Sequence, residues 1–301
     1  MKIKLIINPE AGIQKRNLDR IKKNIFLNKE ERTERKIEEF FKKKELEIDI
    51  AHTKKAGDAT NIAKRSKNYD IIIAAGGDGT INEVINGIEN YKTKLGIIPI
   101  GSENVVSKEL KIPTQINEAC NIILKGKTKK IDLGLINNKK FIFVVGIGFD
   151  AHAITNVKRE VKRLIGKHSY TIAGLKTLFE HKPEELKIKI DNKKEETGYF
   201  AIISNVKRYG GNIKITPEAE LDDGYLDLCI FKNRDVWSVM KYVIGVASGQ
   251  ISKLKEIKHY KIKKADIKAK NKVLYHTAAE IGGTTPVKVS VLPRKLEIIV
   301  P

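Results

Sequence analysis

The sequence predicts an α/β fold with two domains, in which a doubly wound domain built on a parallel sheet is followed by a mainly antiparallel β-rich second domain. Three observations lead to this prediction. Strand and helix patterns alternate over the first third of the chain, and strand patterns follow one another from Thr128 onward. The length of 301 residues also suits about two domains with sizeable cores.

The first domain is predicted from apolar runs that alternate with helical spacings. We expect strands at 2–8, 46–52, 70–75 and 95–100, and helices at 18–44, 56–67 and 80–88. This rhythm implies parallel strands whose ligands bind beyond their carboxyl ends. Residues that follow these strands, such as Asn8, Thr53 and Gly76, are therefore expected to gather around one crevice.

The second domain is predicted from a series of short apolar strands. They are expected at 130–136, 141–149, 186–190, 199–206 and 225–231, with several more after Glu256. Helical patterns at 154–179 and 235–247 interrupt them. We place the domains at 1–127 and 128–293, and the apolar closing residues 294–301 could return to the first sheet.

The stretch IIIAAGGDGTINEV, residues 71–84, predicts a buried strand that turns directly into a helix. Glycines let backbone N–H groups approach a ligand, and a helix N-terminus favours negative charge, so phosphate is the natural ligand. Asp78 would repel a phosphate unless a divalent cation or a transferable proton lay between them, which points to phosphoryl chemistry. The turn alone equally supports Asp78 as a simple helix cap.

The composition limits the classes of partner. A formal net charge of +21 favours polyanions, whether nucleic acid, nucleotide phosphates or an anionic bilayer. No apolar run is long enough to span a membrane, and the N-terminus lacks the features of a signal peptide. Cys120 and Cys229 lie far apart within apolar patterns, which indicates buried thiols of a cytoplasmic protein.

Motifs along almost the whole chain resemble those of the diacylglycerol kinase catalytic superfamily, the bacterial soluble lipid kinases related to sphingosine kinases. In the first half they are INPEAG (7–12), HTKKAGDA (52–59), GGDGTINEV (76–84) and PIGSENVVSKELKIP (99–113). In the second half they are IDLG (131–134), GIGFDA (146–151), RLIGKHSY (163–170) and PEAELDDGYLDL (217–228). GGDGT alone is moderately specific, because NAD kinases carry a similar element, whereas the ordered set is strongly specific.

The resemblance implies transfer of the γ-phosphoryl group of ATP, with Mg²⁺, to the hydroxyl of a membrane lipid such as diacylglycerol. The nucleotide site it implies is lined by Asn8, Thr53, Gly76, Gly77, Asp78, Gly79, Thr80, Asn82 and Ser102. It also implies a structural Mg²⁺ site formed by Asp223 with the backbone carbonyls of Glu220 and Tyr225. Without the resemblance, LDDG is best explained as a type I turn.

One departure from the family bears on catalysis. The family usually carries Asp-Gly-Glu on a late strand, but the aligned stretch here reads HTAAEIGGTTP (276–286), so that Ala278 and Ala279 precede Glu280. A missing base lowers the rate of transfer to an alcohol, by about 100- to 10,000-fold, rather than abolishing binding. We expect an active kinase in which Asp78 or Glu280 takes the proton or orients the hydroxyl. The alternative is a nucleotide- and membrane-binding protein with little turnover.

A lipid acceptor requires docking at a membrane, and two basic segments are candidates. Residues 154–165 form an amphipathic helical pattern, and residues 253–272 alternate lysine with apolar residues. The first could instead pack on the second domain, and the second could be a lysine-protected edge strand. We expect a cytoplasmic enzyme, peripheral at the inner membrane face.

The sequence also bears on nucleic acid binding, on a rival enzyme activity and on the oligomeric state. No recognition helix or aromatic stacking motif supports nucleic acid binding. A rival enzyme is a kinase of a soluble alcohol, of the NAD-kinase type. The sequence leaves the oligomeric state open, a homodimer included.

Overall fold

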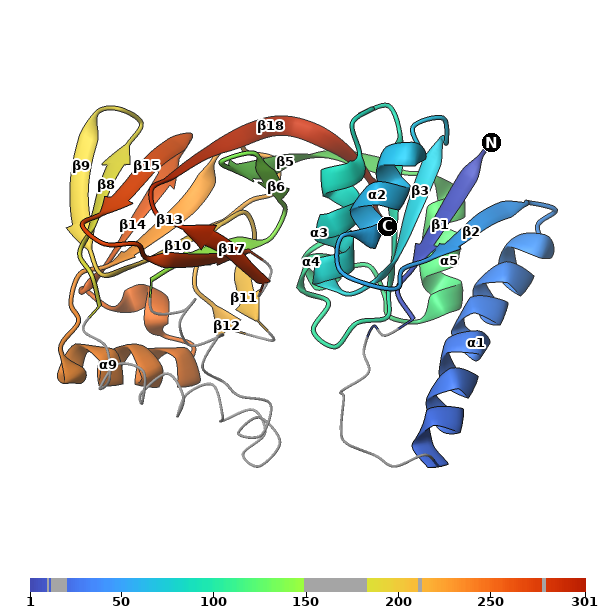
Figure 1. Cartoon of the computed structure of the whole chain (residues 1–301), viewed down its shortest axis with the longest axis horizontal. Coiled ribbons are helices and arrows are strands. Elements are labelled where there is room, and N and C mark those ends of the chain that lie inside the picture. The colour runs from blue at the N-terminus through green and yellow to red at the C-terminus, as the bar shows by residue number, and fades with distance from the viewer. Residues whose placement is uncertain (10, 12–20, 149–182, 211–212, 278–279) are drawn as a thin grey trace. The chain divides into compact units, whose positions relative to one another are not determined.

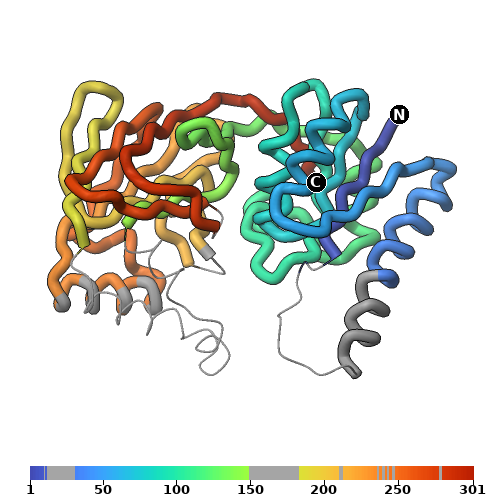
Figure 2. The backbone as a smooth tube through the Cα atoms, viewed as in Figure 1, coloured from blue at the N-terminus to red at the C-terminus, as the bar shows by residue number. Residues whose placement is uncertain are grey.

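The computed structural model describes residues 1–9, 11, 21–148, 183–210, 213–277 and 280–301. The chain forms two compact units, coloured along the chain in Figure 1 and traced as a tube in Figure 2. One unit comprises Met1–Ile131 with Arg294–Pro301, and the other comprises Asp132–Pro293. The amphipathic segment 154–165 and the RLIGKHSY motif lie outside the described residues, so their predicted roles stay predictions.

The first unit is built on a parallel sheet with the strand order β2-β1-β3-β4, continued by the end of β18. These strands are β1 Ile3–Ile7, β2 Ile48–His52, β3 Ile71–Gly76, β4 Lys94–Pro99 and β18 Val287–Ile299. Strand β3 is buried along its whole length, as its continuous apolar run predicts. The strand order reverses between β1 and β3, which is the position where doubly wound sheets bind ligands.

Helices cover both faces of this sheet. They are α1 Ile21–Lys42, α2 Asp58–Arg65, α3 Asp78–Gly87, α4 Val105–Glu109 and α5 Ile116–Lys125. Helices α2 and α3 pack together on one face, and α1 and α5 pack together on the other (Figure 1). Helix α3 buries Ile81, Val84 and Ile85, which recur at helical spacing. The prediction of a doubly wound α/β domain is confirmed.

The second unit contains an antiparallel sheet with the order β14-β13-β10-β7-β16-β17. Its strands are β7 Val144–Ile147, β10 Phe200–Ser204, β13 Leu226–Phe231, β14 Ile257–Ile262, β16 Leu274–Thr277 and β17 Glu280–Thr284. Helix α9, Val236–Ala247, and the short 3-10 helix η2, Ile251–Lys253, connect β13 to β14.

A second antiparallel layer pairs β15 with the first part of β18 and with β8, and pairs β8 with β9. Its strands are β8 Leu186–Ile190, β9 Lys194–Gly198 and β15 Lys264–Ala269. One core joins the two layers and includes Val145 of β7, Ile203 of β10 and Ile267 of β15. The prediction of a mainly antiparallel second domain is confirmed.

Smaller strands complete the second unit. Strand β5, Thr128–Ile136, begins in the first unit, and pairs with β6, Lys139–Phe141. A short pair is formed by β11, Arg208–Gly210, and β12, Ile213–Lys214. Cys120 and Cys229 are buried free thiols, as expected.

Candidate active site

The glycine-rich turn between β3 and α3 lies at the carboxyl ends of the parallel strands. Gly76 ends β3, Gly77 is the residue before α3, and α3 begins at Asp78. Gly77, at the N-cap position, has no side chain with which to cap this helix. Because the first N–H groups of a helix have no partner within it, an uncapped N-terminus offers donors and a partial positive charge to an anion. The turn therefore suits a phosphate group.

Two neighbouring turns come together at this point. The backbone N–H of Ile100 donates to the carbonyl of Gly76 at 3.2 Å, which aligns the ends of β3 and β4. A Cβ atom placed on Gly101 would lie 2.4 Å from the Cα of Gly77, and one on Gly76 would lie 2.4 Å from the Cβ of Thr80. The close approach of the two turns thus requires glycine at position 101, and the Thr80 side chain requires glycine at position 76.

Asn8 joins this cluster from the end of β1. Its Nδ2 donates to the hydroxyl of Thr80 at 3.1 Å, and its backbone N–H donates to the carbonyl of Ala75 at 3.0 Å. Asn8 and the glycine turn therefore lie on either side of the position where the strand order reverses. Thr53 follows β2, where its N–H donates to the carbonyl of Ile7 at 3.0 Å. The structure thus places Asn8, Thr53 and Gly76 at the carboxyl ends of neighbouring strands, and their role in binding a nucleotide stays a prediction.

Asp78 has a role that the sequence did not indicate. Its Oδ2 accepts the N–H of Val105 at 3.0 Å and its Oδ1 accepts the N–H of Val106 at 2.9 Å, so the carboxylate caps α4 rather than its own helix. Burial raises the pKa of Asp78, while these two hydrogen bonds oppose the rise. With both oxygens engaged by N–H donors, the carboxylate ties the glycine turn to the following loop.

Two further nucleotide-site predictions lie in different surroundings. Ser102 is exposed on the loop after β4. Asn82 is half-buried on α3, and its Oδ1 has no hydrogen-bond partner among the described residues. Asn104 was missed by the sequence analysis: it holds the Ser102 loop by accepting the N–H of Gly101 at 3.0 Å and donating to the Gly101 carbonyl at 2.8 Å. Its left-handed φ of 49° is a conformation that asparagine tolerates well.

Glu280 begins β17 in the second unit and is exposed. It is paired with Thr277 of β16 across the antiparallel ladder. Ala278 and Ala279 lie outside the described residues. The assignment of the proton-accepting or orienting role to Glu280 or to Asp78 stays a prediction.

The Asp223 turn is held by an ammonium group. One carboxylate oxygen of Asp223 accepts the N–H of Tyr225 at 3.0 Å, and the other forms an ion pair with Lys261 of β14. Within the described residues, no group of three or more His, Cys, Asp or Glu side chains could hold a metal ion. The predicted Mg²⁺ site of Asp223, Glu220 and Tyr225 thus has one side-chain carboxylate that already faces a cation. The assignment of a Mg²⁺ site to Asp223 with the backbone carbonyls of Glu220 and Tyr225 stays a prediction.

Acidic residues surround Lys261. Burial raises the pKa of Asp227 on β13 to about 6, with smaller contributions in the same direction from Asp223, Glu218 and Glu220, while Lys261 opposes the rise. The hydrogen bond with Asp223 in turn raises the pKa of Lys261. Lys261 therefore compensates a local excess of negative charge.

The LDDG turn is also fastened to β5 by Asp132, which the sequence analysis did not single out. The fully buried Asp132 accepts the N–H of Gly224 at 2.6 Å through Oδ2, and its own N–H donates to the carbonyl of Leu221 at 2.6 Å. Asn205 donates to the backbone carbonyl of Asp132 at 2.8 Å. These hydrogen bonds join the IDLG motif to the LDDG motif, so both motifs have a structural role.

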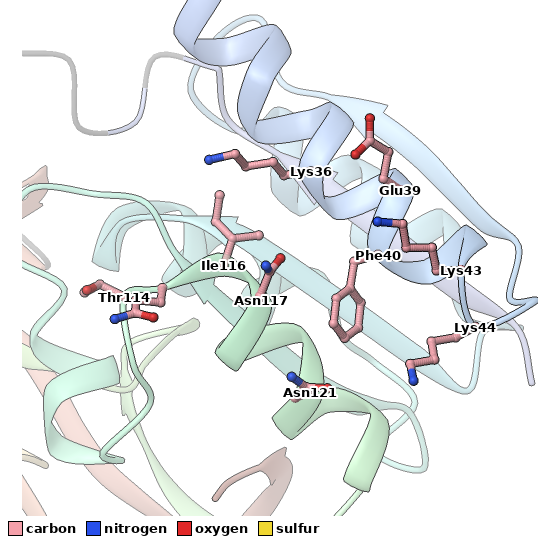
Figure 3. A pocket seen from close by; sticks show the side chains of 10 residues that line it. Lys36, Glu39, Phe40, Lys43, Lys44, Thr114, Ile116, Asn117 and Asn121 are labelled. Atoms are coloured by element: carbon pink, nitrogen blue, oxygen red, sulfur yellow. The ribbon is translucent and has the colours of Figure 1, made fainter.

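A separate groove of about 730 Å³ lies between α1 and α5 (Figure 3). Phe40, Asn117 and Asn121 point into the space between the two helices. Its lining consists of Lys36, Glu39, Phe40, Lys43, Lys44, Thr114, Gln115, Ile116, Asn117 and Asn121. It shares no residue with the glycine turn, so it is distinct from the predicted nucleotide site.

A doubly wound sheet with a glycine-rich turn at its switch point is the construction of a nucleotide- or phosphate-binding protein. Comparison with protein families identifies which kind. A family model for the diacylglycerol kinase catalytic domain matches residues 2–136, and a model for a YegS C-terminal NAD kinase beta sandwich-like domain matches residues 143–300. The chain belongs to the diacylglycerol kinase family and is a lipid kinase.

Individual relatives agree with this assignment. A diacylglycerol kinase of Staphylococcus aureus (strain bovine RF122 / ET3-1) is 32% identical over 256 residues, which cover 83% of this chain and 81% of the relative. A crystal structure of a candidate diacylglycerol kinase from Bacillus anthracis str. Sterne aligns with a TM-score of 0.81 at 27% identity, covering 100% of this chain and 95% of that one. A second structure from the same organism gives a TM-score of 0.80 at 26% identity, covering 100% and 97%. No helix among the described residues has the length and apolar character needed to cross a membrane.

Proposed function

We propose that this lipid kinase transfers the γ-phosphoryl group of ATP, supplied as its Mg²⁺ complex, to the hydroxyl of a membrane lipid such as diacylglycerol. The observation that carries this proposal is the N-terminus of α3, whose N-cap residue Gly77 has no side chain, beside the close approach of Gly77 and Gly101. The relatives are named diacylglycerol kinases, which supports the choice of acceptor.

In this proposal, the residues at the edge of the first sheet hold the triphosphate. Gly76, Gly77, Gly79 and Thr80 present backbone donors, while Asn8 fixes the Thr80 hydroxyl. Thr53, Asn82 and Ser102 complete the nucleotide site. Asp78 supports this arrangement by fixing α4 through Val105 and Val106. Each Asp78 oxygen accepts one N–H bond and keeps a second lone pair, so its predicted alternative roles as base or metal ligand are compatible with these hydrogen bonds.

The reaction forms a bond between the lipid oxygen and the γ-phosphorus and breaks the bond from that phosphorus to the bridging oxygen, releasing ADP. The lipid hydroxyl loses its proton in the process. We assign acceptance of that proton, or orientation of the hydroxyl, to the Glu280 carboxylate. Mg²⁺ enters with ATP, and its charge offsets that of the phosphates when bound.

Incubation with labelled ATP, Mg²⁺ and a panel of lipid alcohols in mixed micelles tests the proposal. We expect a labelled phospholipid, and we expect Glu280→Gln to reduce its formation about 100-fold or more while nucleotide binding, measured by calorimetry, is retained. The proposal would be refuted if calorimetry detected no binding of any purine triphosphate in the presence of Mg²⁺.

Two rivals are distinguished by the same experiment. The NAD kinase-like description of the second-unit family model favours a kinase of a soluble alcohol as the second candidate, which would show labelled product without any detergent or vesicle. A nucleotide- and membrane-binding protein without turnover would be stabilised by ATP yet give no labelled product. We further propose that the enzyme works as a peripheral protein at the inner face of the cytoplasmic membrane.

A further inference from the structure

Helix α9 has an outward-facing stripe that includes large apolar side chains. Trp237, Lys241, Ile244 and Ser248 are exposed and follow one another at the spacing of a single helical face. Trp237 is 75% exposed and Ile244 is 61% exposed, and the other exposed large apolar side chains among the described residues are Met1 and Ile281. Such a stripe is unfavourable in water unless something covers it.

The opposite face of α9 is firmly packed, so the exposed stripe has a fixed direction. Tyr242 is buried and its ring meets that of Phe231 edge to face at 5.0 Å. A Cβ on Gly245 would lie 3.0 Å from the Cα of Ile251, which shows how closely α9 lies against η2. At the start of the helix, Asp235 Oδ1 accepts the N–H of Ser238 at 3.0 Å. Trp237 and Ile244 are therefore held outward by the fold.

The segment that contains the stripe and continues into β14 is basic. Residues 234–258, which include α9, η2 and the start of β14, contain five Lys or Arg and two Asp or Glu residues. Lys253, Lys255 and Lys258 are exposed, whereas Lys241 is paired with Glu256 at 2.7 Å. Lys241, within the stripe between Trp237 and Ile244, and the exposed lysines of the adjoining segment complement a surface that is anionic outside and apolar beneath.

We propose that α9 is the surface through which the second unit lies on an anionic bilayer, with Trp237 and Ile244 entering the interfacial layer. This rests on the proposed function, which places the acceptor in a bilayer. A second copy of the chain fits less well, because two large apolar side chains provide far less than the ~800 Å² per partner of a typical stable interface. The sequence analysis predicted this helix but not its exposed face.

The chain has a single tryptophan, Trp237, so its fluorescence reports on this helix alone. Without ATP, vesicles containing phosphatidylglycerol are expected to shift its emission to shorter wavelength, and brominated lipids are expected to quench it. Vesicles of phosphatidylcholine alone should have a much smaller effect. Ile244→Ser should weaken partitioning into anionic vesicles about tenfold. Trp237→Ser should weaken it by a similar factor, and because this variant has no tryptophan its binding is measured by co-sedimentation with the vesicles.

Ile281→Ser is the matched control. Ile281 is 50% exposed on β17, at the opposite end of its sheet from β14, and its replacement should leave vesicle binding unchanged. The proposal is overturned if anionic vesicles leave the emission unchanged, if Ile281→Ser weakens binding as much as Ile244→Ser, or if the shift arises on concentrating the protein without vesicles.

The kinase assay separates this inference from the proposed function. Ile244→Ser should lose activity toward a long-chain lipid alcohol in anionic vesicles and keep activity toward a short-chain one dispersed in water. Equal loss on both acceptors would overturn the membrane role of α9. Vesicle binding as expected, with no transfer to any acceptor, would refute the proposed function and leave the membrane surface standing.

Discussion

Thr277 and Glu280 are directly opposed partners in the antiparallel pairing of β16 with β17, so positions 278 and 279 alone connect the two strands. Two-residue connections of this kind favour turns with positive φ, which Asp-Gly and Asn-Gly adopt easily and Ala-Ala does not. The Asp-Gly that the family resemblance led us to expect would therefore favour the turn between the two strands, in addition to supplying a carboxylate. We therefore expect the departure at Ala278 and Ala279 to affect the pairing of the two strands as well as the supply of a carboxylate.

The double variant Ala278→Asp/Ala279→Gly is expected to stabilise the hairpin by about 0.5–1 kcal/mol and to raise the rate of phosphoryl transfer. Ala278→Asn/Ala279→Gly supplies the same turn preference without a carboxylate. We expect equal gains from both variants, measured by thermal unfolding and by labelled-lipid formation. A gain in rate confined to the Asp variant would show instead that the missing carboxylate is a base.

Asp78→Ala should lower the free energy of unfolding by about 1–2 kcal/mol, because the N–H groups of Val105 and Val106 both lose their acceptor. Asp78→Asn keeps one acceptor oxygen and should cost less. Urea unfolding of the two variants measures the difference. A folded Asp78→Asn variant that transfers phosphate at the wild-type rate would exclude Asp78 as base or metal ligand.

Stability of the second unit should not depend on Mg²⁺, because Lys261 already neutralises Asp223. In the absence of ATP, the Tm is expected to be the same with Mg²⁺ and with a chelator. Lys261→Met should lower stability by about 1 kcal/mol and make the Tm rise on adding Mg²⁺. Lys241→Met, which breaks the ion pair with Glu256, is the control and should give no Mg²⁺ dependence. A wild-type Tm that falls with the chelator would restore the predicted metal site.

Asp227 should make the protein less stable as the pH rises through about 4 to 6. Its folded-state pKa of about 6 lies above that of an unfolded aspartate, so the folded state binds more protons in this range and the contribution to stability is lost with rising pH. At about pH 7.5, the free energy of unfolding of Asp227→Asn should therefore exceed that of the wild type by about 1–2 kcal/mol, and its Tm should be higher. Both differences should shrink toward about pH 5. A difference independent of pH would contradict the raised pKa.

Much of the first unit could be predicted because its pattern is local. The apolar run before Gly76 and the helical spacing of Ile81, Val84 and Ile85 predict β3 and α3 from adjacent residues. The partner of Asp78 could not be predicted, since the bond to α4 joins loops that meet only when β3 and β4 pair. The same holds for Asp132, whose partner Gly224 lies 92 residues away.

One polar strand of the second unit could not be predicted from apolar alternation. Strand β9, with the sequence KEETG, was missed, since it lacks apolar alternation and is largely exposed. The sequence did contain a local signal, the pair Asp191-Asn192, because Asp and Asn adopt positive φ readily in tight hairpin turns. Both residues have positive φ in the turn between β8 and β9. The exposure of Trp237 could not be foreseen, because helical periodicity does not say which apolar side chains find a partner.

Strand β18 has a consequence for the order of events during biosynthesis. Its early residues pair with β15 and its late residue Ile298 pairs with Leu95 of β4, so the N-terminal sheet receives a strand from the far end of the polypeptide. A ribosome would have to release residues 294–301 before that sheet could close. We expect a chain halted at residue 293 to leave the amides of β4 that face β18 in rapid hydrogen exchange, and slow exchange there would show that the sheet closes without this strand.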